Sequence, residues 1–137
     1  MVNRIELVYA LVQAVHNLGA VTLVAGPVAA LVWQGRSAAV ERRLAWTLLA
    51  AWGLQAAGGA AFAAASYGFK GQIPEVEGVA LAALGIKVAA TVAGFGIAAV
   101  QLWKGRAGAP ARTAPWIACL LLALVAITAA AVLRWYL

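Results

Sequence analysis

The sequence predicts an all-α membrane protein, an antiparallel bundle of four transmembrane helices with both termini on the outer side. Hydrophobic residues make up 66% of the 137 residues and charged residues only 10%, whereas soluble domains are about 45–50% apolar and about 25% charged. Four long stretches have almost no charge, and short links between them favour antiparallel neighbours. A free-standing cytosolic domain and a disordered chain are therefore excluded.

Each expected helix follows from a long run of uncharged residues, because a helix needs about 20 mostly apolar residues to cross a bilayer. The runs lie between Glu6 and Arg36, Arg43 and Lys70, Lys87 and Lys104, and Arg112 and Arg134. The third apolar segment begins near Gly78, so Lys87 interrupts it. The expected helices are residues 5–33, 44–67, 79–103 and 115–136, which form one domain over residues 1–137.

The first helix is expected to stay in the membrane as an anchor. Its apolar stretch is much longer than the roughly 7–15 residues in the core of a signal peptide. Glu6 also interrupts the basic start that such a peptide requires.

Basic residues are distributed unequally between the two ends of the expected bundle. The first and third loops carry six lysines and arginines, and the other side carries three. Because basic loops stay in the cytoplasm, we expect a multi-pass protein of the bacterial inner membrane with both termini outside. The net charge of +6 then reflects topology and anionic lipid headgroups, not nucleic-acid binding. The six are Arg36, Arg42, Arg43, Lys104, Arg106 and Arg112, and the three are Arg4, Lys70 and Arg134.

Aromatic residues agree with these helix ends, since Trp and Tyr favour the membrane–water interface. Trp52 is the exception, because it lies inside the second helix. The expected cytoplasmic ends carry Trp33, Trp46, Trp103 and Trp116, and the outer ends carry Tyr9, Tyr67, Trp135 and Tyr136.

Three polar residues are expected at one level inside the membrane. His16 and Lys87 each lie ten residues beyond a glutamate at the outer surface, or roughly 15 Å deep at 1.5 Å per residue. Gln55 enters from the other side and lies roughly 18 Å from it. An ionisable residue at this depth indicates a functional site, because a central lysine costs about 2.5–3.5 kcal/mol. Snorkelling of Lys87 to the surface is the alternative.

Small residues lie one turn apart around both ionisable groups. Such residues let helices pack closely, and they would equally leave room for a flat cofactor. They are Ala83, Ala90, Gly94 and Ala98 near Lys87, and Gly19, Gly26 and Ala30, together with Val12 and Leu23, near His16.

The residue inventory limits the chemistry. With one His, one Cys and no Asp, a single chain cannot form a carboxylate dyad, a serine triad or a multi-histidine metal site. Cys119 is expected to be a small core residue. His16 has three interpretations: a packing residue bonded to Gln13 or Gln55, a proton relay, or a ligand of haem iron. A second iron ligand would come from Lys87, from another subunit, or from neither.

Three segments resemble the HemJ-type four-helix membrane protoporphyrinogen oxidases in order and spacing. Residues 9–27, YALVQAVHNLGAVTLVAGP, resemble the first helix of that family through Tyr9, Gln13, Ala14, His16, Ala25 and Gly26. Residues 40–46, VERRLAW, resemble its acidic-basic-basic-Leu segment, and residues 84–94, LGIKVAATVAG, its lysine-bearing helix. Copper-resistance D-type membrane domains share a looser version of the histidine helix.

The resemblance implies a b-type haem bound by His16, with Lys87 taking part in ligand binding or porphyrin chemistry. We assign Gln13, Gln55, Gly19 and Gly94 to the same cofactor site. If the protein is an enzyme, a porphyrinogen is oxidised there and haem or a quinone accepts the electrons. Whether the chain is an enzyme is left open.

Two other functions are weighed against this one. The alternative function is a non-catalytic accessory subunit of a larger respiratory or redox complex, packed through its Ala and Gly faces. The expected assembly is such a complex or a homo-oligomer. Copper handling is disfavoured, because no cluster of Cys, Met or His is present to hold the ion.

Overall fold

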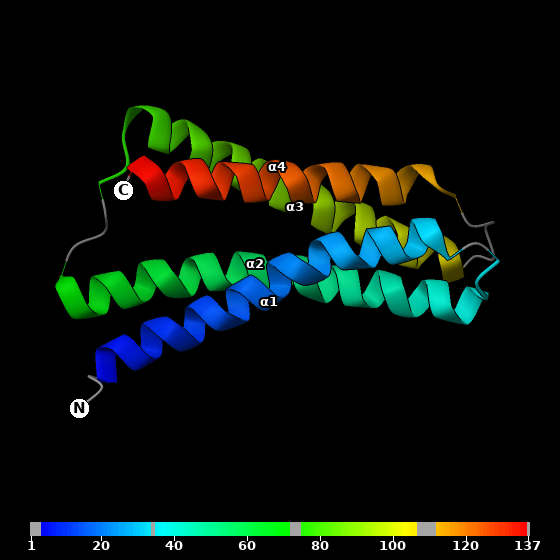
Figure 1. The fold of residues 1–137 in the computed structure, drawn as a ribbon, viewed down its shortest axis with the longest axis horizontal. Helices are drawn as coiled ribbons and strands as arrows, with labels where there is room; N and C mark the ends of the chain where they lie inside the picture. The colour runs from blue at the N-terminus through cyan, green and yellow to red at the C-terminus, as the bar shows by residue number, and fades with distance from the viewer. Residues whose placement is uncertain (1–3, 34, 72–74, 107–111, 137) are drawn as a thin grey trace.

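The structure, a computed structural model, describes residues 4–33, 35–71, 75–106 and 112–136. These residues form four helices (Figure 1), each long and apolar enough to span a membrane, as predicted. The helices are α1 (Arg4–Val32), α2 (Ala38–Lys70), α3 (Gly78–Arg106) and α4 (Ala114–Tyr136).

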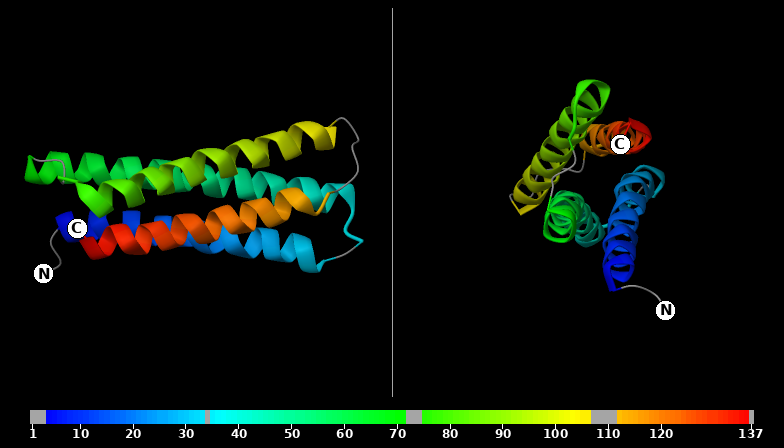
Figure 2. Two further views of the ribbon diagram at one scale, coloured as in Figure 1. Left: turned by 90° about the horizontal axis from the view of Figure 1, so that it is seen from above. Right: turned by 90° about the vertical axis from the view of Figure 1, so that its left-hand side faces the viewer.

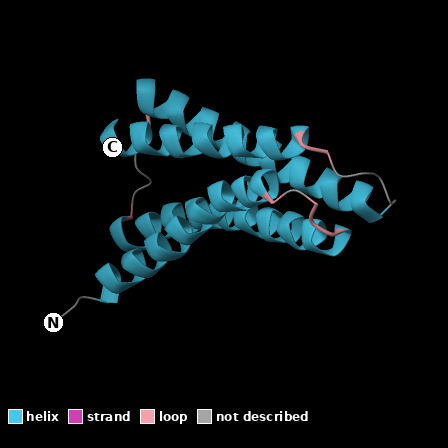
Figure 3. Ribbon diagram, turned by 45° about the vertical axis from the view of Figure 1, so that its right-hand side comes forward, coloured by secondary structure: helices cyan, strands magenta, loops and turns pink. Residues whose placement is uncertain are grey.

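The helices form an antiparallel bundle with up-down topology (Figure 2), which confirms the predicted architecture. Helix α1 packs against α2 and α4, and α3 packs against the same two helices, so α1 and α3 are diagonal. The α1–α2 and α3–α4 connections lie at one end of the bundle and both termini at the other (Figure 1). Toward the termini, the hairpin of α1 and α2 diverges from the hairpin of α3 and α4 (Figure 3).

Helix α2 begins at Ala38, six residues before the expected start, so residues 38–43 are helical and not part of the first loop as predicted. Ser37 caps the helix, because its hydroxyl oxygen accepts a hydrogen bond from the Val40 N–H at 3.3 Å. Glu41 lies in the first turn, where a negative charge complements the helix dipole. At the other end, Gly71 adopts a φ of 67° and its N–H donates to the Tyr67 carbonyl, as in glycine-terminated helices.

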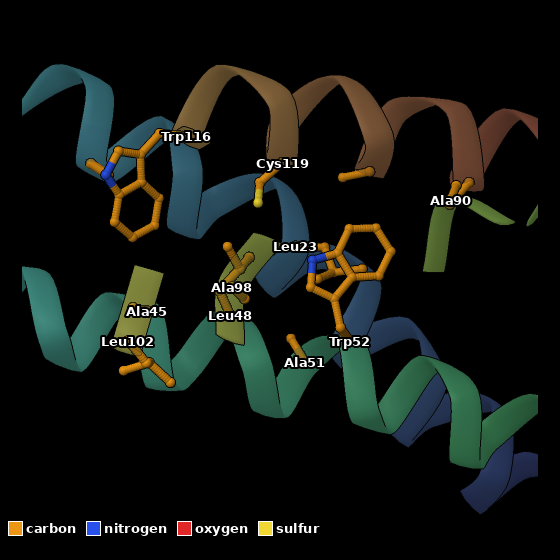
Figure 4. Close-up of a cluster of buried hydrophobic side chains, with 13 residues drawn as sticks. Leu23, Ala45, Leu48, Ala51, Trp52, Ala90, Ala98, Leu102, Trp116 and Cys119 are labelled. Atoms are coloured by element: carbon orange, nitrogen blue, oxygen red, sulfur yellow. The ribbon is translucent and has the colours of Figure 1, made fainter. Parts of the chain in front are cut away.

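The core is made of alanines, three leucines, two tryptophans and Cys119 (Figure 4). Trp52 and Trp116 are 0% and 1% exposed. Trp116 lies in the first turn of α4, at the helix end where it was expected, but it is buried inside the bundle, whereas Trp33, Trp46 and Trp103 are exposed. Cys119 is buried and free, as expected of a core residue. Small side chains over most of this core let the four backbones approach closely.

Helices α1 and α2 make a polar contact near the end of the bundle that carries the termini. The Tyr9 hydroxyl donates to the Ser66 hydroxyl oxygen at 3.4 Å, and its ring packs edge-on against Phe62. Ser66 is 2% exposed, so this hydrogen bond satisfies a buried hydroxyl. It gives Tyr9 a role in packing α1 against α2, which its expected interfacial position did not indicate.

Candidate functional site: His16 and Lys87

His16 and Lys87 project from the inward faces of α1 and α3. The small residues that share these helical faces are buried. They are Gly19, Gly26 and Ala30 in α1, and Ala83, Ala90, Gly94 and Ala98 in α3. Each ionisable side chain is itself half-buried. These positions favour close helix packing along both faces, and they put the two polar groups toward the interior of the bundle.

The His16 imidazole packs directly on the backbone of α2. A Cβ atom placed on Gly58 would lie 2.7 Å from His16 Nδ1 and 3.5 Å from its Cγ, so only glycine fits there. Nδ1 is buried and makes no hydrogen bond within the described residues. An imidazole has two ring nitrogens. Because Nδ1 is enclosed against Gly58, a ligand would have to bind Nε2.

Gln55 holds α2 at the level of His16. Its amide nitrogen donates a hydrogen bond to the backbone carbonyl of His16 at 2.7 Å. This contact agrees with the equal depth expected for the two residues. The Gln55 amide does not bond the His16 imidazole, so Gln55 is not the side-chain partner that the sequence analysis considered for His16.

Lys87 lies on α3, the helix diagonal to α1, and its side chain is half-buried. No hydrogen bond or ion pair of its ammonium occurs in the part of the chain that the structure describes. Among these residues, the structure therefore has an unpaired imidazole nitrogen on α1 and an unpaired cation on α3.

The other predicted site residues have different neighbours. Gln13 is exposed and donates to the Asn17 side-chain oxygen at 2.8 Å. The space beside Gly19 is filled by the Gln55 amide, and the space beside Gly94 by the Trp52 indole. In this structure, both glycines thus accommodate side chains of α2.

Neither of two cavities found among the described residues is lined by His16 or Lys87. The larger, about 1320 Å³, lies at the end that carries the two connections. The smaller, about 420 Å³, is an apolar groove between α3 and α4. Among the described residues there is no group of three or more His, Cys, Asp or Glu that could hold a metal ion, so His16 offers a single imidazole ligand.

Sequence reasoning missed a polar cluster made by Arg36, Glu41 and Trp116. Arg36 forms a 3.4 Å ion pair with Glu41, donates to the Ala30 and Trp33 carbonyls, and stacks 5.6 Å from the Trp116 ring. The Trp116 indole N–H donates to the same Glu41 carboxylate at 3.3 Å. The cluster joins the end of α1 to the starts of α2 and α4, although its charges had indicated only topology.

Removing the Glu41 carboxylate should destabilise the bundle. In Glu41→Ala, the half-buried Arg36 guanidinium and the Trp116 N–H both lose an acceptor, and an unsatisfied buried partner costs about 1–3 kcal/mol. We expect a loss of about 1–2 kcal/mol in the free energy of unfolding, measured in detergent. Glu75→Ala, at an exposed position, is the control and should leave stability unchanged. Equal stabilities of the two variants would show that the cluster is not stabilising.

Comparisons with known proteins add no relative: no family model matches the chain, and no curated protein or solved structure matches it. The fold defines a class, a four-helix bundle able to span a membrane. The HemJ-type resemblance stays a prediction from the three segments quoted above.

Proposed function

We propose that this chain is an integral membrane protein that binds haem or a related porphyrin for redox chemistry, with His16 as iron ligand and Lys87 in the same site. The observation that carries this proposal is the half-buried His16 imidazole, whose Nδ1 is enclosed against Gly58 without a partner. The order and spacing of the HemJ-like segments also support it.

His16 is the single imidazole of the chain that would hold a porphyrin iron. His16 would coordinate through Nε2, and a bound haem b would supply a one-electron redox centre. Lys87 would pair with a porphyrin carboxylate, a contact strengthened in a low-dielectric interior. The Gln55 hydrogen bond fixes the backbone of α1 beneath the imidazole.

The test is the visible absorption spectrum of the detergent-purified protein. The wild type should show a Soret band, and His16→Ala should reduce its intensity per folded protein at least about tenfold, because no second imidazole exists to replace the ligand. Asn17→Ala changes the adjacent, exposed polar residue of α1 and should keep the band. An unchanged band in His16→Ala would exclude His16 as the ligand.

We further propose that the protein lies in a bacterial inner membrane with both termini in the periplasm. The six-to-three distribution of basic residues supports this orientation, since basic loops remain cytoplasmic. A periplasm-dependent phosphatase fused to the C-terminus should be active, and a cytoplasm-dependent fluorescent protein should stay dark. Bright fluorescence would reverse the orientation.

A second function, an accessory subunit of a larger redox complex, is favoured by one observation. Gln13 and Asn17 are both exposed and bonded to each other in the middle of an apolar helix. Side-chain amides at membrane depth commonly hydrogen bond to a neighbouring helix, here one supplied by a partner or a second copy. A colourless protein with stoichiometric partner subunits would support this function over porphyrin binding.

A further inference from the structure

The larger cavity has a polar mouth and an apolar interior. It lies between the start of α2, the end of α3 and the start of α4, at the end of the bundle that carries both connections. Its deep wall includes Ala93, Ile97 and Ala118, and its mouth carries charged side chains. Ala93 and Lys104 are eleven residues apart along α3, so the cavity extends roughly 16 Å along the helix.

Three cations line the mouth of the cavity. Arg36 also lines the cavity, but its charge is paired with Glu41. Arg42, Lys104 and Arg112 are exposed at the same mouth, and their side chains have no ion pair within the described ranges. Three unpaired positive charges around one opening favour an anionic group there.

The Gln101 side-chain amide, one turn before Lys104 along α3, carries a hydrogen-bond donor and an acceptor. Its amide nitrogen and oxygen are both buried, and neither has a hydrogen-bond partner in the described chain. The residue lines the cavity. A buried amide without partners is costly, so a ligand that reaches the Gln101 amide and bonds it would relieve this cost.

We propose that this cavity binds an anionic phospholipid of the surrounding leaflet. The headgroup phosphate lies among Arg42, Lys104 and Arg112, the glycerol and ester region bonds Gln101, and one acyl chain follows the apolar wall of α3. Basic pockets between membrane helices bind acidic lipid headgroups in this way. The site is independent of His16 and Lys87, and requires only that the bundle lies in a membrane.

The test is lipid retention by the whole protein, measured by native mass spectrometry in detergent. Phosphatidylglycerol and phosphatidylcholine with identical acyl chains are titrated in parallel. The wild type should bind phosphatidylglycerol at least about tenfold more tightly, because only its headgroup carries a net negative charge. Equal affinities for the two lipids would overturn the proposal. So would displacement of phosphatidylglycerol by an equal concentration of inorganic phosphate, since the site would then recognise the anion alone.

Two double variants with the same net charge locate the site. Arg42→Gln/Lys104→Gln removes two cations at the cavity and should weaken phosphatidylglycerol binding about tenfold or more. Arg4→Gln/Arg134→Gln removes two exposed cations at the opposite end and should leave binding unchanged. Equal weakening in both variants would show a general charge effect and would overturn the site.

Gln101→Leu separates the polar contact from folding. The variant removes a buried amide without partners and should keep or raise the thermal unfolding temperature of the lipid-free protein. It should weaken phosphatidylglycerol binding several-fold. A stable Gln101→Leu protein with wild-type lipid affinity would exclude Gln101 from the site.

Discussion

Gly94→Ala should lower the free energy of unfolding by about 3 kcal/mol, the upper part of the usual range for overpacking a core. The added Cβ would overlap the Trp52 ring at Cε2 and Cζ2. Trp52 is fully buried, so its rigid ring has no free space to move into, and α2 and α3 must separate. The expected result is a large fall in the stability measured by unfolding in detergent.

Gly85→Ala is the matched control, in the same helix. A Cβ at Gly85 would meet nothing within 4 Å, and alanine is the better helix former by about 1 kcal/mol. Gly85→Ala should therefore keep or slightly raise stability. If the two variants were equally stable, the close approach of α2 and α3 at Gly94 would be wrong.

The number, order and apolar character of the helices could be predicted because each depends on one segment. A run of uncharged residues is a local property, and so is the length that a bilayer requires. The end of a helix depends on capping instead. The charges at residues 41–43 predict a helix start at residue 44, but Ser37 caps a helix that begins at Ala38, and Glu41 is favourable in its first turn.

Contacts between helices were harder to predict. The equal depth of His16 and Gln55 followed from counting residues, and the hydrogen bond between them agrees with it. The small residues near Lys87 and His16 could have lined a cofactor or packed against other helices. The periodicity of one helix does not specify its neighbour, so Trp52 beside Gly94 and Gly58 beside His16 were not foreseen.

The Arg36, Glu41 and Trp116 cluster was missed for the same reason. Glu41 and Trp116 are 75 positions apart in sequence, and the three residues meet only after α4 packs against α1. Gln55 and Gln101 are both single amides within apolar helices. Gln55 bonds the backbone of α1, whereas Gln101 lines a cavity and has no partner among the described residues.

Lys87→Met should separate porphyrin binding from simple helix packing. Methionine keeps the length and apolar bulk of the side chain and removes its charge. If Lys87 pairs with a porphyrin carboxylate, the porphyrin content per folded protein should fall at least about tenfold, because a charge-assisted contact in a low-dielectric site is lost. The porphyrin-free protein should become more stable, by at most the roughly 2.5–3.5 kcal/mol that a lysine costs at the membrane centre.

The measurements are the Soret absorbance per folded protein and the unfolding midpoint in detergent. Lys87→Arg, which keeps a positive charge, should retain most of the porphyrin. Arg134→Met removes an exposed cation near the end of α4 and should change neither the Soret absorbance nor the unfolding midpoint. Full porphyrin content in Lys87→Met, with raised stability, would exclude Lys87 from the site. It would instead make Lys87 a polar residue that a packing subunit tolerates.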